Sequence, residues 1–384
     1  MRFPSLVGLN DFGVYVHIPF CAHRCGYCDF ATWADRDNLV DAYVDACVTD
    51  LERRRSTIPP ATSVFFGGGT PSLLPAERLT EILDAIVRTT DAEVTVECNP
   101  DSVTDEVFAT YVEAGVKRVS LGAQSFAPHV LATLDRTHDV ANVAASVAAA
   151  NRAGIERINL DLIYGTPGET VDDWRASLDA VLDLGVTHVS AYALTIESGT
   201  PLGRAIRAGA ALAPDDDDLA DKYAIADDVL VANGLANYEV SNWARSGHEC
   251  RHNLLYWTMG EYTAIGCAAH GHTEGRRWWN VRTPERYIEL IRAGTSPVVG
   301  HDELDVDQRR EEAFALALRT SLGVEFAAAA GSTVADLTAA GLLDTHGSRI
   351  GLTRRGRLVA SDVTARLVLA GAVGDGEVVG TRYH

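Results

Sequence analysis

Residues 14–30 read VYVHIPFCAHRCGYCDF, a β-branched run followed by three closely spaced cysteines. The run ends at Pro19, and Cys21, Cys25 and Cys28 then follow in the spacing Cys-x-x-x-Cys-x-x-Cys. Thiolates are the usual ligands of iron–sulfur clusters. Three thiolates bind three irons of a 4Fe–4S cubane, so the spacing predicts such a cluster with its fourth iron free. That iron can bind the amino and carboxylate groups of S-adenosylmethionine.

The main alternative is a zinc site with His17 or His23 as the fourth ligand. Structural zinc sites usually combine two ligands in one place with two more far away in the chain. The other cysteines are Cys47, Cys98, Cys250 and Cys267. They form no second close pair, which favours the iron–sulfur cluster. An odd number of cysteines in a chain of this length does not suggest a disulfide framework.

Six β-branched runs in the first half of the chain alternate with stretches of helical period, such as 79–88 and 140–152. The expected strands are 14–18, 63–67, 93–97, 118–122, 157–163 and 188–194. Six strands that are each followed by a helix predict an α/β fold with a parallel sheet and helices outside it. The six-fold repetition favours a partial (β/α)6 barrel over a flat doubly wound sheet.

The second half of the chain has a different pattern. An acidic run at 215–218 predicts the N-cap of a helix over 219–233. The aromatic and glycine-rich stretch 250–280 predicts irregular structure packed on the barrel, and 322–369 predicts a winged-helix-like unit with a packing role. The expected domains are the barrel over 1–240, an aromatic and glycine-rich segment over 241–285, and a C-terminal helical domain over 286–384.

Composition limits the partners and the location of the protein. The 384 residues carry a formal net charge of −20, and the largest basic cluster is 53–55. Nucleic-acid binders normally have a basic face, so no nucleic-acid partner is expected. We find no run of about 18 apolar residues that predicts a transmembrane helix, and no secretory signal in 1–10. The expected location is the cytoplasm.

Polar and glycine residues gather where the expected strands end. Glycines 67–69 end the second strand, Glu97 ends the third, Gln124 follows the fourth and Asp161 lies in the fifth. The reactive site of a parallel α/β barrel lies at these strand ends. Buried carboxylates and amides are costly unless they are paired, and a ribose or a sulfonium would be a suitable partner. Taken singly, the glycines also fit a tight turn, and Glu97 or Gln124 also fits a hydrogen-bonded core residue.

These motifs resemble the radical S-adenosylmethionine superfamily. The resemblance rests on the Tyr-x-His-Ile-Pro-Phe-Cys lead-in at 15–21, Gly-Gly-Gly-Thr-Pro at 67–71 and Asn-Leu-Asp-Leu-Ile-Tyr-Gly at 159–165. Within the superfamily the chain is similar to the branch that contains the oxygen-independent coproporphyrinogen III oxidases and the HemW-type haem chaperones. The resemblance implies that S-adenosylmethionine is bound by Tyr15, Tyr27, Gly68, Gly69, Thr70, Glu97, Gln124, Arg136 and Asp161.

Two features separate the chaperones from the oxidases. The oxidases have a fourth cysteine where this chain has Phe30, and a longer segment before the cysteine motif. Residues 252–257, His-Asn-Leu-Leu-Tyr-Trp, match the His-Asn-x-x-Tyr-Trp signature of the chaperones. Imidazole is a good axial ligand of haem iron, so His252 is the expected haem ligand. A packed core histidine is the alternative for His252, and Cys250 or Cys267 could supply a thiolate instead. The loop 266–271 has no role that the sequence assigns.

The resemblance therefore implies a haem chaperone of porphyrin metabolism that passes haem to an unidentified acceptor protein. Its cofactors would be the 4Fe–4S cluster, S-adenosylmethionine and haem. A peripheral contact with a membrane-bound acceptor, a homodimer and catalytic use of S-adenosylmethionine are left open. The enzyme alternatives are radical decarboxylation of coproporphyrinogen III, which the motifs disfavour, and radical chemistry on an unrelated substrate with His252 purely structural.

Overall fold

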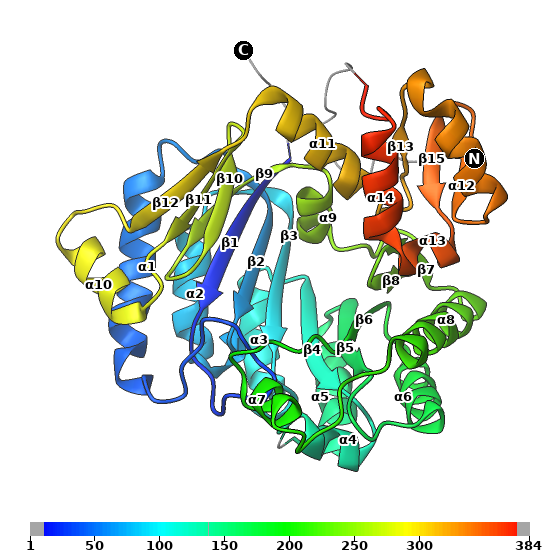
Figure 1. Cartoon of the computed structure of the whole chain (residues 1–384). Helices are drawn as coiled ribbons and strands as arrows, with labels where there is room; N and C mark the ends of the chain where they lie inside the picture. Colours follow the sequence, from blue (N-terminus) through cyan, green and yellow to red (C-terminus); the bar gives the residue numbers. More distant parts are fainter. Residues whose placement is uncertain (1–10, 137, 375–384) are drawn as a thin grey trace.

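The computed structural model describes residues 11–136 and 138–374. Within them, one sheet of twelve strands forms the centre of the molecule, in the order β12-β11-β10-β9-β1-β2-β3-β4-β5-β6-β8-β7 (Figure 1). Its strands are β1 (Phe12–Ile18), β2 (Ala61–Gly68), β3 (Arg88–Cys98), β4 (Arg118–Gln124), β5 (Arg157–Tyr164), β6 (His188–Ala193), β7 (Ala236–Glu239), β8 (Asn242–Ala244), β9 (Glu261–Ile265), β10 (His270–Thr273), β11 (Arg276–Asn280) and β12 (Val298–Glu303).

Strands β1 to β6 are parallel and lie side by side in the order of the sequence. A doubly wound sheet reverses its strand order at a switch point, whereas a barrel does not. The uninterrupted order therefore confirms the α/β barrel-type fold that the sequence predicts. Each of the six expected strands is present, longer than expected by one to six residues except β6, which is one residue shorter.

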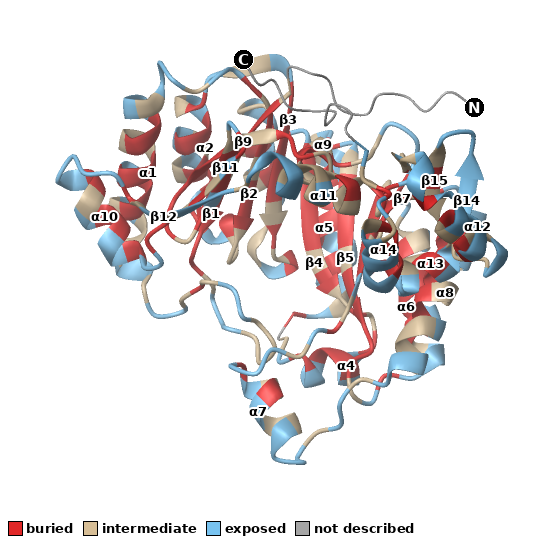
Figure 2. Ribbon diagram, turned by 45° about the horizontal axis from the view of Figure 1, so that its top comes forward, coloured by how far each residue is buried: buried red, intermediate tan, exposed pale blue. Residues whose placement is uncertain are grey.

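Helices cover the outer face of the sheet, and Figure 2 shows their buried sides turned toward it. Strand β1 is almost continuously buried, as expected where both faces of a parallel sheet are covered. The α-helices are α1 (Val40–Arg54), α2 (Ala76–Ala85), α3 (Asp105–Glu113), α4 (Pro128–Thr133), α5 (Val140–Ala153), α6 (Val171–Asp183), α7 (Pro201–Arg207), α8 (Asp216–Ala232), α9 (Arg251–Trp257), α10 (Pro284–Arg292), α11 (Val306–Ala317), α12 (Gly331–Ala339), α13 (Arg354–Leu358) and α14 (Ala360–Leu369). Short 3-10 turns lie at Asp37–Leu39, Pro71–Leu73, Pro100–Ser102 and Ala328–Ala330.

Two of the predicted helices, now seen as Ala76–Ala85 and Asp216–Ala232, begin three residues earlier than predicted. The helix expected at 79–88 ends at Ala85, because Ile86 is already extended and Arg88 begins β3. The helix expected at 219–233 begins at Asp216 instead, since Asp215 is its N-cap and accepts a hydrogen bond from the Asp218 amide at 3.0 Å. The acidic run is therefore the helix cap and first turn.

The prediction of irregular structure for 250–280 is wrong. This segment forms α9 and the strands β9, β10 and β11, and β9 pairs in parallel with β1. The strands have only four or five residues each, so no apolar alternation is long enough to be recognised in the sequence. Pairing with the sheet, rather than local pattern, fixes their conformation.

The C-terminal unit has a core of its own, which includes Phe314, Leu318 and Leu337. Its three-stranded sheet has the order β13 (Val324–Glu325), β15 (Arg349–Leu352), β14 (Leu343–His346). In the sequence, the β14–β15 hairpin lies between α12 and the helices α13 and α14, as the winged-helix-like pattern predicts.

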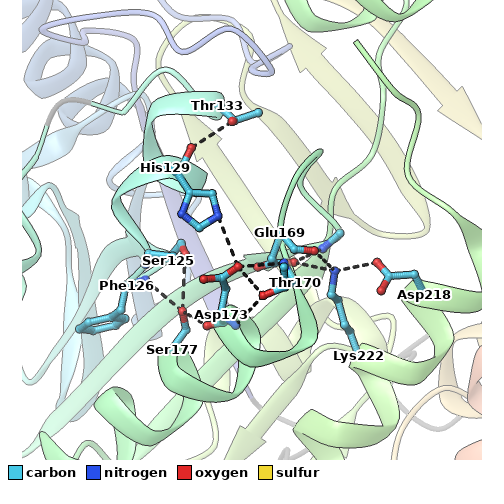
Figure 3. A network of polar contacts seen from close by, with 12 residues as sticks. Ser125, Phe126, His129, Thr133, Glu169, Thr170, Asp173, Ser177, Asp218 and Lys222 are labelled. Carbon is cyan, nitrogen blue, oxygen red and sulfur yellow. Dashed lines mark hydrogen bonds and ion pairs between the residues drawn. The ribbon is translucent and has the colours of Figure 1, made fainter.

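A buried polar network attaches α6 and α8 to the end of β5 (Figure 3). The Lys222 ammonium is fully buried and contacts Glu169 Oε2 at 3.2 Å and Asp218 Oδ2 at 2.6 Å. It also donates to the Glu169 carbonyl at 2.9 Å, while Glu169 Oε2 accepts from the Gly165 amide at 2.7 Å. The network holds the loop that follows β5, and β5 is the strand that carries Asp161.

Candidate functional site

The three motif cysteines lie on the loop that follows β1. The amide of Cys21 donates to the Trp33 carbonyl at 3.0 Å, and the Trp33 amide donates to the Pro19 carbonyl at 2.8 Å. These bonds close the loop at its base. Cys21, Cys25 and Cys28 are all half-buried and unpaired, so their thiols remain accessible to a cofactor.

Polar side chains from two other loops, after β2 and after α4, reach two of the cysteine sulfurs. Arg136 Nη1 donates to Cys25 Sγ at 3.7 Å, and Thr70 Oγ1 donates to Cys21 Sγ at 3.9 Å. Burial raises the pKa of the Cys21 and Cys28 thiols, so a positive charge is needed to hold them as thiolates. Two of the residues predicted to bind S-adenosylmethionine therefore lie beside the predicted cluster ligands.

Among the described residues, no group of three or more His, Cys, Asp or Glu side chains is arranged to hold a single metal ion. A cubane is different because each thiolate binds a different iron. Both histidines of the zinc alternative are also engaged: His17 Nε2 with the Ala31 carbonyl at 3.0 Å, and His23 Nε2 with Asp135 Oδ2 at 2.8 Å. The residues present fit a cluster better than a zinc ion.

The glycine loop packs directly on the cysteine loop. Gly68 has φ +114°, a conformation that favours glycine, and a Cβ on Gly69 would lie 2.6 Å from the Phe20 carbonyl and 3.0 Å from Cys21 Sγ. The Gly69 amide donates to the Ile18 carbonyl at 2.8 Å. Close approach between the two loops is thus one reason for the glycines.

Glu97 and Asp161 place two half-buried carboxyl groups inside the barrel. The Gly68 amide donates to Glu97 Oε2 at 3.1 Å, and burial together with the nearby Asp161 charge raises the pKa of Glu97 to about 8. Asp161 accepts from Ser120 Oγ at 2.9 Å and from Asn159 Nδ2 at 2.8 Å, and burial raises its pKa too. In the described part of the chain neither carboxylate has an ion-pair partner within 4.0 Å, so a cationic ligand would offset their charge.

The other predicted cofactor residues lie around the same strand ends. Gln124 has φ +64°, a sparsely populated conformation for a residue other than glycine, and Arg136 Nη2 donates to the Gly122 carbonyl at 2.9 Å. The Tyr15 hydroxyl donates to His17 Nδ1 at 3.1 Å. Tyr27 is half-buried, and burial raises its pKa, with the Cys25 charge adding to the effect.

The inward side chains of β1, β2 and β3 form layers, because alternate residues of a strand face the same side. The pairing register places Gly13, Ser63 and Glu93 in one layer, near the start of β1 and β2 and in the middle of β3. Helix α9 closes this end: a Cβ on Gly13 would lie 3.0 Å from the His252 ring. The His-Asn-x-x-Tyr-Trp signature therefore forms the floor of the barrel.

His252 is 1% exposed, and both of its ring nitrogens have partners. Nδ1 bonds to Ser63 Oγ at 2.9 Å and Nε2 to the Tyr256 hydroxyl at 2.9 Å. Burial lowers the pKa of His252 to about 3, so the ring is neutral near pH 7. The Phe65 ring lies 5.4 Å from it. Haem ligation by His252 stays a prediction, and it requires that the bond to Tyr256 or to Ser63 be broken.

Sequence reasoning missed the side chains that hold α9 in place. Glu93 Oε1 accepts from the Arg251 amide at 2.8 Å, and its Oε2 pairs with Arg157 at 2.9 Å. Asn253 Nδ2 donates to the Tyr238 hydroxyl at 3.2 Å. The one hint of these contacts in the sequence is Glu93, an acidic residue within an expected strand.

The two alternative thiolate ligands are buried. Cys250 is 3% exposed and Cys267 is fully buried. Burial raises the pKa of each thiol to about 12, and the Tyr43 hydroxyl donates to Cys267 Sγ at 3.6 Å. Neither sulfur is placed to ligate haem in this conformation.

Beside the carboxylates a cavity of about 680 Å³ opens between the parallel strands and β9 to β11. Tyr15, Gly68 and Glu97 line one side, and His270 and Trp279 line the other. Cavities of roughly 300–1,000 Å³ are typical of cofactor and ligand sites. The volume is thus large enough for a second ligand next to the predicted S-adenosylmethionine residues.

Comparison with known proteins identifies the family. The family model described as "Radical SAM superfamily" matches residues 15–181. "Heme chaperone HemW" of Mycobacterium tuberculosis (strain ATCC 25618 / H37Rv) is 47% identical over 371 residues, which cover 94% of this chain and 95% of that protein. The chain belongs to the HemW family. "Heme chaperone HemW" of Bacillus subtilis (strain 168) is 34% identical over 91% of this chain and 97% of that protein.

A solved structure shows the same fold. Coproporphyrinogen III oxidase (HemN) from Escherichia coli matches with a TM-score of 0.81 over 93% of this chain and 90% of that one. Its sequence identity is 20%, so the match establishes the fold alone. In the described ranges, no helix combines the length and the apolar character needed to cross a bilayer.

Proposed function

We propose that this protein is a cytoplasmic haem chaperone, which binds haem and transfers it to an acceptor protein. The observation that carries the proposal is the 47% identity over nearly the whole chain to proteins named heme chaperone HemW. The signature at 252–257 and Phe30, in place of the fourth cysteine of the oxidases, support it. The proposal leaves three points to separate tests: the identity of the acceptor, a peripheral contact with a membrane-bound acceptor, and a homodimer. The proposed domain boundaries at residues 240 and 285 also need a test of their own.

The proposed cofactors fit the residues around the strand ends. Cys21, Cys25 and Cys28 would hold a 4Fe–4S cluster, which when bound offers one open iron to S-adenosylmethionine. Glu97 and Asp161 would balance the positive charge of the sulfonium and amino groups or bind the ribose hydroxyls. The remaining proposed contacts are Tyr15, Tyr27, Gly68, Gly69, Thr70, Gln124 and Arg136.

Coproporphyrinogen III oxidase is the second candidate, because the oxidase has the same fold. The test uses anaerobically reconstituted protein of confirmed iron content with coproporphyrinogen III, S-adenosylmethionine and a low-potential reductant, and reads products by mass spectrometry. An oxygen-independent coproporphyrinogen III oxidase treated in the same way is the positive control. The chaperone proposal predicts no product. Successive losses of carbon dioxide and two hydrogens from the propionates would overturn it in favour of the oxidase.

A further inference from the structure

The cavity beside Glu97 contains one histidine that is free to bind a metal. His270 is exposed and lines the cavity, and its Nδ1 lies 3.0 Å from the Ala268 carbonyl oxygen. A carbonyl oxygen only accepts hydrogen bonds, so Nδ1 carries the proton and Nε2 keeps its lone pair. Metal-binding histidines are commonly held in this way, with the other ring nitrogen donating to a carbonyl. Among the described residues, Nε2 has no hydrogen-bond partner.

The other imidazoles and thiols near the cavity are already engaged. His17 also lines it, but its Nδ1 accepts from Tyr15 and its Nε2 donates to the Ala31 carbonyl. His252 lies beneath Tyr15 and Phe65, outside the cavity lining, and both of its nitrogens are bonded. Cys250 and Cys267 are buried and outside the lining. This leaves His270 as the accessible nitrogen ligand.

The loop that leads into His270, the first residue of β10, is held in place by hydrogen bonds. The Ala268 amide donates to the Val281 carbonyl at 2.7 Å, and Asn280 Nδ2 donates to the Gly266 carbonyl at 2.7 Å. Ala268 has φ +55°, a strained conformation for a residue other than glycine, and such strain is common at ligand sites. The His270 ring is stacked on Trp279, with centroids 5.9 Å apart and an interplanar angle of 29°. The imidazole is thus oriented before a ligand arrives.

One part of the cavity, away from the Asp29 and Glu97 carboxylates, suits a flat apolar molecule with a carboxylate at its edge. Phe30 is 68% exposed and lines the cavity, with Tyr256 and Tyr262 on its wall. Aromatic faces of this kind pack against planar rings. Arg282 lines the cavity, is exposed and makes no ion pair with any described residue within 4.0 Å. A free guanidinium is suited to a carboxylate such as a haem propionate.

We propose that haem occupies this cavity with His270 Nε2 as an axial ligand of the iron and a propionate at Arg282. The inference rests on the proposed haem-chaperone function and assigns its ligand. His252 is then a positioning residue: its hydrogen bond fixes the Tyr256 hydroxyl in the cavity wall. Haem and S-adenosylmethionine would share the space between Glu97 and His270, so each would alter the binding of the other.

The test is a haem titration of the full chain, followed by absorbance and by electron paramagnetic resonance of the ferric complex. The variants are H270A and H252A, with H346A, an exposed histidine of the β14–β15 hairpin, as the matched control. H270A should lose at least ten-fold in affinity and lose the imidazole-ligated spectrum, which added imidazole should restore. H270C should give a thiolate-ligated spectrum. H252A should keep the imidazole-ligated spectrum with weaker binding, and H346A should match the wild type.

A second comparison tests Arg282. R282A should weaken binding of haem and leave binding of haem dimethyl ester unchanged, because the ester lacks the carboxylates. Wild-type spectrum and affinity in H270A, or loss of the imidazole signature in H252A alone, would overturn the assignment to His270 while the chaperone proposal stands. Absence of saturable haem binding by the wild type would overturn both.

Discussion

At the scale of single residues, the barrel holds two carboxyl groups, Glu97 and Asp161, that have no ion-pair partner within 4.0 Å among the described residues. Burial raises the pKa of Glu97 because it removes the hydration of the charged form, and the charge of Asp161 raises it further. A cofactor with a sulfonium and an amino group would relieve that cost. The site is therefore prepared for a cation before the cofactor binds.

The substitution E97Q should change how stability depends on pH. The pKa of folded Glu97 is about 8, against an ordinary value of 4.5. Between these values the folded state keeps a proton that the unfolded state has lost, so wild-type stability falls as pH rises through this window. The E97Q side chain cannot ionise, so its free energy of unfolding should not fall in this window. Relative to wild type, E97Q should therefore become more stable from pH 5 to pH 8.5, by up to about a few kcal/mol, and its melting temperature should rise relative to that of wild type. Thermal unfolding of cofactor-free protein measures this.

The control for that measurement is E113Q, since Glu113 is exposed. The E113Q melting temperature should follow the wild type at every pH. Parallel curves for E97Q and wild type would show that Glu97 is already ionised in the folded protein at neutral pH, contrary to this account.

Serine at position 21, 25 or 28 should remove the cluster. Each variant C21S, C25S and C28S lacks one of the three proposed thiolates, and an alcohol is a poor iron ligand. Iron and sulfide should fall from about four of each per chain to near zero after anaerobic reconstitution. C98A should load normally, because Cys98 is a buried core residue that donates to the Val96 carbonyl. Stoichiometric zinc in the wild type, with no sulfide, would contradict the cluster.

Local motifs point to candidate ligand residues in the sequence, but they do not predict how those residues pack. The family resemblance predicted Arg136 as an S-adenosylmethionine contact, and in the structure its Nη1 lies 3.7 Å from Cys25 Sγ, a contact that the sequence did not predict. The same reasoning left a packed core histidine as the alternative for His252, but it did not identify Ser63 and Tyr256 as the partners of the ring. Those partners come from a strand and a helix turn whose contact depends on the tertiary structure, which no short motif encodes.

At the scale of elements, the attachment of α6 and α8 depends on one buried ammonium. Lys222 Nζ bonds to the Glu169 carbonyl and to two carboxylates, and Trp174 Nε1 donates to the Lys222 carbonyl at 2.8 Å. Removing one partner of a buried ion pair is much more destabilising than replacing the whole pair. The loop after β5 should therefore be sensitive to this residue.

The substitution K222M should destabilise the protein by about 3–5 kcal/mol, because it leaves the Glu169 carboxylate buried without its cation. Chemical denaturation of the cofactor-free protein measures the loss. D218N is the matched comparison: the Asp218 side chain is 38% exposed, so water can replace its contact and the loss should be about 1 kcal/mol or less. Equal effects of the two substitutions would contradict the buried pair as the stabilising contact.

Element prediction succeeded where a segment fixes its own structure. The helix over 216–232 begins at an N-cap that the acidic run predicts. The six parallel strands coincide with short runs rich in apolar and β-branched residues. The prediction of irregular structure was wrong for β9 to β11, because these short strands are stabilised by pairing with β1 and with one another. Strands of this kind are specified by neighbours that are distant in the sequence.

At the scale of the whole molecule, charged contacts join α13 of the C-terminal unit to α8 of the barrel. Arg357 Nη2 pairs with Asp227 Oδ2 at 3.0 Å, and its guanidinium lies 5.6 Å from the centre of the Tyr223 ring. Asp227 Oδ1 also accepts from Trp243 Nε1 at 2.9 Å. Both partners of the ion pair are mostly buried, so the contact is one that solvent does not easily replace.

The substitution R357A should loosen this junction. It leaves Asp227 without its cation, at a cost of about 2 kcal/mol, while the separate core of the C-terminal unit remains. Hydrogen exchange should become faster in α13 and α14 and stay unchanged in β1 to β6. R366A, which removes an exposed arginine of α14, should leave exchange as in the wild type. Equal acceleration over the whole sheet would indicate global destabilisation instead of a local junction.

The central claim is that this chain binds haem in order to pass it on. The most direct measurement titrates the wild-type protein with haem and then mixes the complex with a haem-free globin as a general acceptor, following both steps by absorbance. The account predicts saturation at one haem per chain, followed by movement of that haem to the globin. Haem uptake that never saturates, or bound haem that stays on the protein when the globin is in excess, would contradict it.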